Sequence, residues 1–533
     1  MRKFSSYGPI DTDLYYYAPR QALIEQAVAD LVGDDPTKGG HYITVWAPRQ
    51  RGKTWIIQQA LRCLRNEPPY RDAFDVLYVP LEYLKLEKDV EKIAQSLAQE
   101  IIRALDLPPI AIHEMREIEQ VFRRDVLRKP LILLLDEFDA LIEEAIAGIA
   151  GVFRNVYIRR QTEADRPTGE KTYLLHGVAL IGVRAVLGVE NPRGSPFNVQ
   201  RSLHVPNLTF EEVQGLFDWY ARESGQAVEP AVVERLFYET RGQPGLTCWF
   251  GELLTETYNP DRSRPIGLAA FEHVYIAASS VLPNNNILNI LSKARQEPYK
   301  GYVLEMFRTD EPVAFKYDDP ILNFLYLNGV VDWEWSSTAE PQVKFPCPFV
   351  QKRLFSHFAG ELFREIGRLY DPFEDLSDTI TDASLDVRNL LRRYERYLQQ
   401  NRSWLLKDAP RRADLRIYEA VYHFNLFAYL SRFLGRRDAL VYPEFPTGNG
   451  KVDLLIRYAG RLYGLEVKSY ADEFAYQEAL HQAARYGRQL GLTEITLAFF
   501  VERVDDASRQ KYEARYMDPE TGVAVSPVFV ATD

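Results

Sequence analysis

Two segments of this sequence carry residue types suited to binding phosphate or a divalent cation, and the first is a loop. The octapeptide APRQRGKT, residues 47–54, follows the apolar run YITVW and precedes the helix-forming stretch WIIQQALRCL. A glycine-containing turn between a strand and a helix directs backbone N–H groups and the helix dipole at bound phosphate. Lys53 can then reach the β- and γ-phosphates, and the Thr54 hydroxyl can ligate Mg²⁺. We therefore predict a P-loop that binds ATP with Mg²⁺.

Within this loop, small residues decide how closely a ligand can approach. Gly52 lets the backbone come near the phosphates, whereas Ala47 stands where the strictest form of the pattern has glycine. The alternative interpretation is a plain strand-to-helix turn without a ligand. The loop residues that we assign to the nucleotide are Ala47, Gln50, Arg51, Gly52, Lys53 and Thr54.

A second part of the same predicted site is the apolar run LILLL, which ends in Asp136 and Glu137. Ligands of open α/β sheets bind at the carboxyl ends of buried strands, where these two carboxylates would lie. We expect Asp136 to bind the nucleotide and hold Mg²⁺ together with Thr54, and Glu137 to polarise the attacking water. A strand that simply ends in solvated carboxylates is the alternative.

The second segment with chemical potential is KVDLLIRYAGRLYGLEVK, residues 451–468, which we interpret as a β-hairpin turning at Ala459 and Gly460. Because strand side chains alternate, Glu466 and Lys468 share one face while Val467 turns away and leaves its carbonyl nearby. Two carboxylates, from Asp453 and Glu466, and the Val467 carbonyl form a hard oxygen site that suits Mg²⁺.

A lysine beside such a site can orient or deprotonate a water molecule for in-line attack on a phosphodiester. The predicted catalytic residues of the hairpin are therefore Asp453, Glu466 and Lys468. A Glu-x-Lys tripeptide is common by chance, so a surface ion-pair network is the alternative interpretation. A third interpretation is a nuclease fold that binds nucleic acid without cutting it.

The elements that position these residues form an alternating pattern. Residues 40–190 alternate apolar strands with helices, which predicts an α/β domain with a parallel sheet covered on both faces. A Thr209-x-x-Glu212 capping box opens a helical lid, and two helices, a third helix and a hairpin follow in the order of a winged helix. The predicted domains are 1–204 (P-loop core), 205–280 (lid), 281–370 (winged helix), 371–410 (helical linker) and 411–533 (second α/β domain).

The first 270 residues resemble AAA-like P-loop ATPases of bacteria and archaea, close to the STAND and archaeal-ATPase branches. The segments that carry this resemblance are YYYAPRQALIEQAVADL, the APRQxGKT loop, the DEFD box and the Gly-Gln-Pro of the lid. By this resemblance Arg241 near the Gly-Gln-Pro and Arg184 after a strand are sensor candidates. The resemblance singles out no arginine finger; the candidates are Arg159, Arg160 and Arg193.

The last 120 to 150 residues, approximately, resemble the PD-(D/E)XK nuclease superfamily, and more specifically its RecB-like members. Gln482 and Tyr486 match the Gln-x-x-x-Tyr element of that group, whose residues one helical turn apart would face the site. Glu419 stands where the superfamily keeps an acidic metal ligand. The chain lacks the literal Pro-Asp pair, and Asp453 follows Gly450-Lys-Val instead. The resemblance implies a restriction-endonuclease-like α/β fold.

Composition excludes several classes of protein. The chain has 533 residues, 46% hydrophobic and 26% charged, which is typical of a globular protein and not of a disordered one. Its net charge is −11, but residues 381–533 hold 22 Lys and Arg against 21 Asp and Glu, so the acidity lies before them. Three dispersed cysteines and the lack of a long apolar stretch predict a cytoplasmic protein without disulfides and without a membrane partner.

These observations together predict an ATP-hydrolysing module that controls a Mg²⁺-dependent nuclease. DNA is favoured over RNA as the partner, a homo-oligomer or a regulatory protein partner is conceivable, and defence against foreign DNA is suggested by analogy. A STAND-like signalling ATPase with a non-cleaving C-terminal module is the main alternative. An ATP-driven DNA translocase is another.

Overall fold

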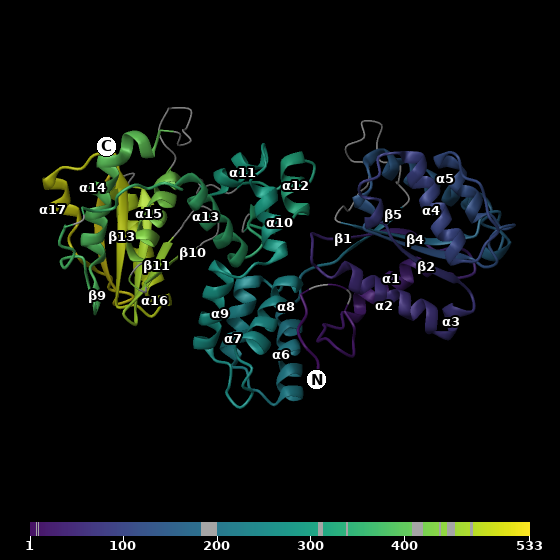
Figure 1. Ribbon diagram of the computed structural model, residues 1–533, viewed down its shortest axis with the longest axis horizontal. Helices are drawn as coiled ribbons and strands as arrows, with labels where there is room; N and C mark the ends of the chain where they lie inside the picture. Colours follow the sequence, from purple (N-terminus) through teal and green to yellow (C-terminus); the bar gives the residue numbers. More distant parts are fainter. Residues whose placement is uncertain are drawn as a thin grey trace. The chain divides into compact units, whose positions relative to one another are not determined.

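The computed structural model describes most of the chain and divides it into two compact units, which we call unit 1 (Met1–Leu282) and unit 2 (Pro283–Asp533) (Figure 1). The described residues are 1–6, 8, 10–182, 200–307, 313–336, 339–371, 373–407, 419–435, 437, 439–444, 453–469 and 473–532. For residues 200, 419, 420, 444, 453 and 469 the description covers the backbone alone.

Unit 1 is built on a parallel sheet with strand order β2-β3-β4-β1-β5. All six residues of β3 are buried, because helices cover both faces of the sheet. This confirms the predicted α/β fold of the P-loop type. The strands are β1 (Tyr42–Trp46), β2 (Asp75–Pro80), β3 (Leu131–Asp136), β4 (Leu175–Gly182) and β5 (Gln200–His204).

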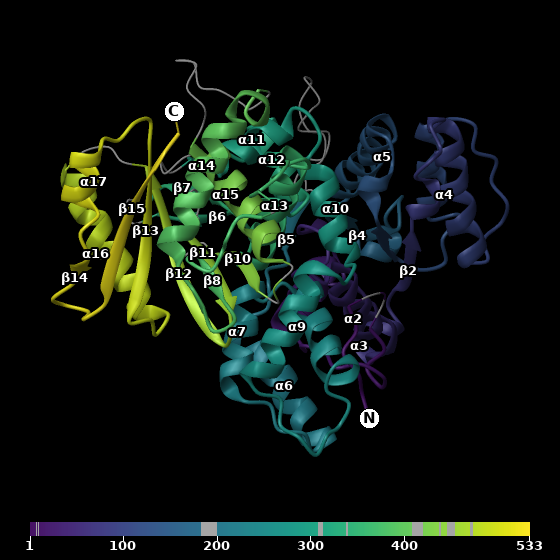
Figure 2. The same cartoon turned by 60° about the vertical axis from the view of Figure 1, so that its left-hand side comes forward.

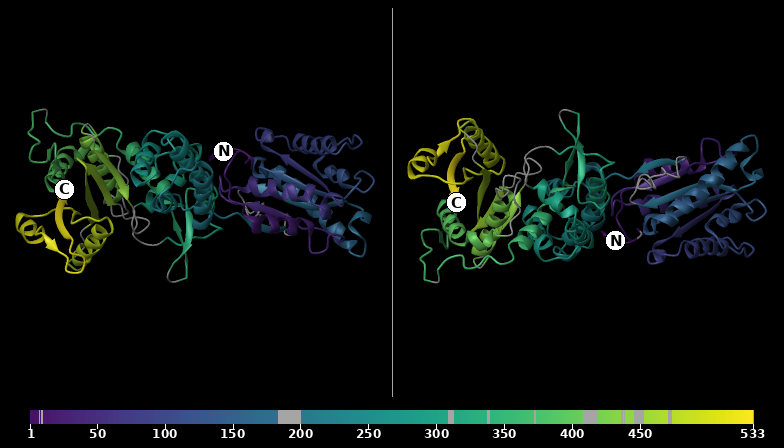
Figure 3. Two further views of the ribbon diagram at one scale, coloured as in Figure 1. Left: turned by 90° about the horizontal axis from the view of Figure 1, so that it is seen from below. Right: turned by 90° about the horizontal axis from the view of Figure 1, so that it is seen from above.

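Two layers of helices enclose this sheet (Figures 1 and 3). Helices α1 (Gln21–Val32), α2 (Lys53–Asn66) and the short α3 (Pro68–Arg71) lie on one face. Helices α4 (Val90–Ala104) and α5 (Glu143–Thr162) lie on the other, with a 3₁₀ helix at Met115–Phe122. Further 3₁₀ turns span Glu82–Leu84, Phe138–Ala140 and Thr168–Glu170.

After β5, the regular structure described in unit 1 is mainly helical. It contains α6 (Phe210–Ser224), α7 (Pro230–Thr240), α8 (Pro244–Glu252) with a π-helical extension (Leu253–Thr257), and α9 (Leu268–Ser280). The predicted capping box is confirmed, because Thr209 Oγ1 accepts a hydrogen bond from Glu212 N and the Glu212 carboxylate accepts one from Thr209 N. We call α6–α9 the lid.

Unit 2 begins with helices and a hairpin. The elements are α10 (Asn285–Ala294), α11 (Tyr299–Met306), α12 (Pro320–Leu327), β6 (Asp332–Trp335), β7 (Pro341–Lys344) and α13 (Pro348–Leu362). Just before α12, a single bridge joins Ala314 to Gln342. The order of the other elements is the predicted one, and the winged-helix assignment itself stays a prediction.

The C-terminal part of unit 2 is a mixed sheet in the order β10-β11-β12-β13-β15-β14. Its strands are β10 (Leu440–Glu444), β11 (Asp453–Tyr458), β12 (Arg461–Ser469), β13 (Glu494–Val501), β14 (Tyr516–Met517) and β15 (Ala524–Ala531). Figure 2 shows α16 (Glu473–Gln489) and α17 (Asp506–Tyr512) on one side of it and α14 (Val387–Leu405) and α15 (Glu419–Leu434) on the other. The hairpin β11–β12 turns at Ala459 and Gly460, as predicted.

Helix α14, in the segment predicted as a helical linker, packs on this sheet. Arg392 forms an ion pair with Glu513, and Glu395 accepts hydrogen bonds from Arg509 (2.6 Å) and from Ala531 N (2.6 Å). The tiny hairpin β8 (Ile380–Thr381) and β9 (Ser384–Leu385) precedes α14. The polar stretch before α14 thus includes ordered structure.

Among the described helices, none is both long enough and apolar enough to cross a lipid bilayer.

Burial of His176 in β4 generates a prediction about stability. Its ring nitrogens lie 2.9 Å from Val32 O and 2.9 Å from Thr168 Oγ1, and burial lowers the pKa of His176 to about 3. The unfolded chain, with an ordinary histidine pKa of about 6.5, therefore binds a proton that the folded chain does not bind. We expect the free energy of unfolding of unit 1 to fall between pH ~6.5 and ~4, by up to about 1.4 kcal/mol per pH unit.

Urea unfolding at several pH values checks this. His176→Asn should lower stability at neutral pH and flatten its dependence on pH, whereas the exposed His113→Asn should keep the wild-type slope. Equal slopes in the wild type and in His176→Asn would contradict the assignment.

Candidate functional site

The loop between β1 and α2 has the backbone geometry of a phosphate-binding turn. Gln50 and Gly52 adopt left-handed conformations, with φ of 58° and 87°. Lys53, the first residue of α2, donates from Nζ to the carbonyls of Ala47 (3.0 Å) and Pro48 (3.2 Å). A Cβ added at Gly52 would meet no atom within 4 Å, so the space beside this backbone is open. The loop residues therefore fit a group that approaches the N–H donors.

The carboxylate of Asp136, at the end of β3, joins three parts of this site. Its Oδ2 accepts hydrogen bonds from Thr54 Oγ1 (3.1 Å) and from the Tyr78 hydroxyl (2.6 Å), and its Oδ1 accepts one from Glu137 N (2.9 Å). A hydroxyl and a carboxylate in contact are oxygen ligands of the kind that Mg²⁺ prefers. The structure thus brings the predicted residues Thr54 and Asp136 together.

Tyr78 on β2 was not anticipated from the sequence. It stands in the middle of an ordinary apolar strand, DVLYVP, and only the pairing of β2 with β3 brings its hydroxyl to Asp136. Burial, followed by the hydrogen bond to Asp136, raises the pKa of Tyr78 well above its usual value, so the phenol stays a donor. No local sequence signal identifies such a residue.

Charges around Lys53 are concentrated. Burial lowers the pKa of Lys53, and the carboxylates of Asp139, Glu137 and Asp136 oppose that shift. Burial also raises the pKa of Glu137, with the negative charges of Asp139 and Asp136 adding to the effect. Glu137 has φ of 54°, which is unusual for a residue other than glycine and is often found at functional sites. The ammonium and three carboxylates can bind an anionic ligand together with a cation.

The lid touches the P-loop at Gln50. The N–H of Gly245, at the start of α8, donates to Gln50 O (3.2 Å), and a Cβ built on Gly245 would come within 2.3 Å of Gln50 Oε1. A side chain at position 245 would therefore force the Gln50 side chain to move. Gln50 therefore joins the phosphate-binding loop to the lid.

Arg20, the residue before α1, ties the same parts together from the N-terminal side. Its guanidinium donates to the carbonyls of Arg51 (3.4 Å), Pro206 (2.8 Å) and Asn207 (3.2 Å). Its Nε lies 3.5 Å from the Glu212 carboxylate of α6, and only 5% of the side chain is exposed. Arg20 therefore connects the P-loop to the lid, a role that its sequence context did not reveal.

Of the five arginines considered as sensors or fingers, the structure describes Arg159, Arg160 and Arg241. Arg160 is buried and donates to Tyr173 O and Thr168 Oγ1, and Arg159 donates to the Tyr173 hydroxyl. Arg241 is exposed and stacks over the Tyr238 ring at 5.2 Å. Arg184 and Arg193 lie outside the described residues.

In unit 2, the hairpin places a buried acidic side chain beside a lysine. Glu466 is 1% exposed, and its Oε1 lies 3.2 Å from Lys468 Nζ. The same ammonium lies 3.4 Å from Oε1 of Gln482 on α16. The register sets Asp453 directly opposite Glu466. Three of the predicted residues, Glu466, Lys468 and Gln482, are therefore in contact, and Asp453 is placed by its backbone alone.

The other predicted residues of this cluster are less informative. Tyr486 is 8% exposed and packs in the apolar cluster between α16 and the sheet, together with Leu497 and Phe499. Glu419 is the first residue of α15, and its side chain, like that of Asp453, lies outside the description. Val467 is buried, and its neighbour across the parallel ladder is Ala498.

A cation beside Glu466 would need further oxygen ligands in addition to the Glu466 carboxylate. Among the side chains that the structure describes, no cluster of three or more His, Cys, Asp and Glu is arranged for a metal. Glu466 offers carboxylate oxygens and Val467 a carbonyl, which are suitable donors for Mg²⁺. The remaining ligands would come from positions 453 and 419, so the residues present are compatible with a cation.

Comparisons with known proteins concern only part of the chain. No family model and no curated protein matches it. Similar solved structures include the ORC1 protein of Aeropyrum pernix in complex with DNA, at 16% identity and a TM-score of 0.33, covering 63% of this chain and 92% of that one. A Walker-type ATPase of Pyrococcus abyssi has 14% identity and a TM-score of 0.40, covering 66% and 99%. Cdc6p of Pyrobaculum aerophilum has 14% identity and a TM-score of 0.34, covering 65% and 96%.

The bond from Tyr78 to Asp136 yields a testable consequence. Tyr78→Phe removes a donor that fixes one carboxylate oxygen, and loss of such an outer partner commonly weakens metal affinity by roughly 10- to 100-fold. We expect the contribution of Mg²⁺ to ATP affinity to fall by about tenfold, with Mg²⁺-free nucleotide binding unchanged. Calorimetric titration with and without Mg²⁺ measures both quantities.

The matched control is Tyr83→Phe, because Tyr83 is 59% exposed and lies in the 3₁₀ turn after β2. It should bind like the wild type. If Tyr78→Phe bound Mg²⁺ and ATP as tightly as this control, Tyr78 would have no part in positioning Asp136.

Proposed function

We propose that this protein binds and hydrolyses ATP in unit 1 and thereby controls a Mg²⁺-dependent nuclease site in unit 2 that cleaves DNA. The observation that carries the nuclease proposal is the buried contact of Glu466 with Lys468, whose ammonium also contacts Gln482. The contact of Thr54 with Asp136 beside Lys53 supports the ATP site.

Burial is the reason to favour a functional interpretation of Glu466. Removing a carboxylate and an ammonium from water costs on the order of several kcal/mol per ion, which their attraction repays only in good geometry. Exposed ion pairs, such as Lys344 with Glu334 on the β6–β7 hairpin, carry no such cost. A buried pair at the end of parallel strands, where open sheets bind ligands, favours catalysis.

The backbone register supports Asp453 as the source of a second carboxylate. Residues directly opposite each other in antiparallel strands project from the same face, with Cβ atoms about 5 Å apart. The pairing of Asp453 with Glu466 therefore supports shared binding of one Mg²⁺ by both residues, with the Val467 carbonyl and Glu419 as further ligands. When bound, the metal would polarise the phosphate and stabilise the charge that develops on it.

The chain's own residues then have defined tasks. Lys468 Nζ orients the attacking water and donates to the phosphate, and Gln482 holds the ammonium in place. The water oxygen bonds to phosphorus and loses a proton to solvent, the bond from phosphorus to the leaving oxygen breaks, and that oxygen takes up a proton from solvent to become a hydroxyl. Tyr486, one helical turn after Gln482, packs in the apolar cluster that holds α16 on the sheet.

In the ATP site, Lys53 and the loop N–H groups would bind the phosphates, Thr54 and Asp136 would hold Mg²⁺, and Glu137 would orient the attacking water. The contacts of Gln50 with Gly245 and of Arg20 with Arg51 and Glu212 support a lid that responds to the nucleotide. A role in defence stays a prediction.

Cleavage of labelled DNA and RNA by the full chain, with Mg²⁺ and with or without ATP, tests the proposal. Lys468→Ala should reduce DNA cleavage by about 100-fold or more, in the range usual for a lost proton-transfer or orienting group. Gln482→Ala, which leaves the ion pair intact, should reduce it by about tenfold. Lys53→Ala should abolish the response to ATP.

Lys344→Ala is the matched control, because it removes a paired lysine from a strand of the same unit. It should cleave like the wild type. Lys468→Ala leaves the Glu466 carboxylate buried without its cation, so the folding of this variant must be checked by thermal unfolding. If Lys468→Ala does not fold, the cleavage rate of Gln482→Ala decides whether the site is catalytic. Wild-type cleavage rates in both variants would refute the assigned site, and cleavage of RNA alone would change the substrate.

A further inference from the structure

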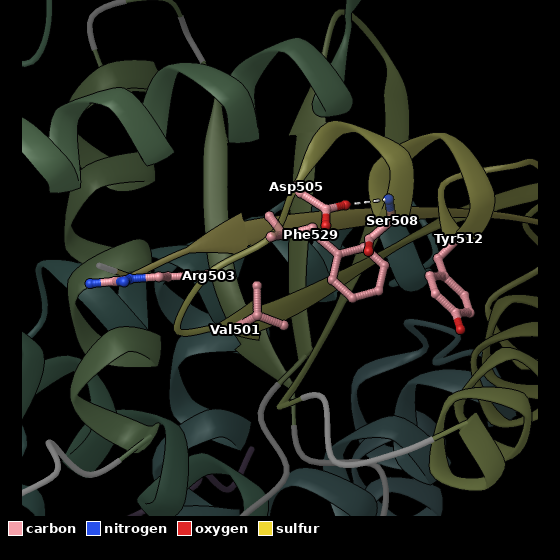
Figure 4. Close-up of a pocket in the computed structure, with 7 residues that line it drawn as sticks. Val501, Arg503, Asp505, Ser508, Tyr512 and Phe529 are labelled. Atoms are coloured by element: carbon pink, nitrogen blue, oxygen red, sulfur yellow. Dashed lines mark hydrogen bonds between the residues drawn. The ribbon is translucent and has the colours of Figure 1, made fainter.

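A cavity of about 400 Å³ opens in unit 2 where β13 and β15 end. Its walls include Val501 at the end of β13, Phe529 on β15 and Tyr512 at the end of α17. Asp505 and Ser508 form its polar side, and the Asp505 carboxylate accepts a hydrogen bond from Ser508 N (2.7 Å) (Figure 4). The volume is within the range of small-molecule sites.

This cavity lies on the same face of the sheet as the Glu466–Lys468 pair. Lys468 pairs with Phe499, and Phe499 pairs in turn with Phe529, so the three side chains form one row under α16. Val501 follows Phe499 by two residues on the same face. From standard strand dimensions, the Cα of Val501 lies about 8 Å from that of Lys468, and that of Phe529 about 10 Å.

The lining favours a flat, largely apolar ligand with polar edges. Phe529 and Val501 pack in the apolar cluster beneath α16, and Tyr512 lies with its ring 6.1 Å from that of Phe529. The Asp505 carboxylate can accept from an amino group and the Ser508 hydroxyl can donate or accept. A carboxylate in the wall opposes a phosphate, whereas a nucleobase offers amino donors and an apolar face.

Groups around the cavity suit the phosphates and bases of a nucleic-acid strand that continues past the cavity. Arg503 points away from the two aromatic rings in Figure 4. Lys511 lies over the Tyr512 ring at 4.4 Å. Phe474, in the first turn of α16, is 73% exposed. Tyr512 donates to Glu473 in the same turn (2.6 Å), so α16 begins beside the cavity.

We infer that this cavity binds one unpaired nucleobase of the nucleic acid that is cut beside Lys468. The inference rests on the proposed nuclease function and specifies its substrate. Stacked nucleotides are about 3.4 Å apart along one strand, so a distance of about 8 Å places the bound base within about three nucleotides of the scissile phosphate. A base in a duplex is stacked and paired, so the substrate is a strand that is single or frayed at this point.

A base-deletion experiment tests this on the full chain. Single-stranded oligonucleotides carry one abasic site at each successive position along their length, on both sides of the cleavage point where cleavage occurs, and both binding and cleavage are measured. Binding is followed by fluorescence anisotropy with Ca²⁺ in place of Mg²⁺. One abasic position within three nucleotides should weaken binding and cleavage by the wild type by about tenfold, the size expected for one lost base-stacking contact.

Variants that fill the cavity provide the second arm. Val501→Trp and Ser508→Tyr should bind intact oligonucleotides about tenfold more weakly than the wild type and show no further loss with the abasic site. Met517→Trp is the matched control, since Met517 is 56% exposed on the edge strand β14, and it should keep the abasic effect. Using two filling variants guards against a single one that fails to fold.

The outcomes separate this inference from the proposed function. Suppose that the wild type cleaves nothing, that one abasic site weakens its binding, and that the same abasic site does not weaken binding by the filling variants. The nuclease proposal then fails and the base site stands. If cleavage occurs and no abasic position within three nucleotides matters, the base site is refuted and the nuclease stands. An abasic effect that persists unchanged in both filling variants also refutes the site.

Discussion

The burial of a carboxylate inside unit 2 is the constraint on which the rest of this account depends. Glu466 lies on a strand covered by helices on both sides, where a negative charge is costly unless cations and donors surround it. Lys468 supplies the cation from the same strand, and Gln482 fixes that cation from α16. Helix α16 therefore packs beside the hairpin, and its first turn contacts Tyr512, which lines the cavity beside β13.

Unit 1 also contains a buried carboxylate, but different groups surround it. The carboxylate of Asp136 ends a fully buried strand and is held by hydroxyl groups, one from Thr54 and one from Tyr78. Neutral donors leave its negative charge available, while Lys53 provides the positive charge nearby. Such an arrangement suits a site that takes up a cation together with an anionic ligand. Arg20 and Gly245 bring the lid into contact with the same loop.

The sequence predicted the elements whose signals are local. The P-loop follows from a short pattern of residue types, the start of α6 from Thr209 and Glu212, and the β11–β12 hairpin from alternation around Ala459 and Gly460. Each of these depends on neighbours within about 20 residues, which is the distance over which periodicity and capping act.

The features that escaped prediction depend on contacts between distant segments. Tyr78 reaches Asp136 only because β2 and β3 are neighbours in the sheet. Arg20 forms its ion pair with Glu212, which lies almost two hundred residues later in the chain. The ion pair of Arg392 on α14 with Glu513 likewise joins residues that are more than a hundred positions apart in the chain. The cavity at Val501 requires β13, β15 and α17 together, so no single segment indicates it.

The most direct test of the central claim is whether Glu466 takes part in binding a divalent cation. Titration of the nucleotide-free protein with Mn²⁺, followed by electron paramagnetic resonance, counts the bound ions. The account predicts a bound Mn²⁺ that is lost in Glu466→Gln and retained in Asp136→Asn. Equal Mn²⁺ binding by the wild type and by folded Glu466→Gln would contradict it and leave the buried pair a purely structural feature.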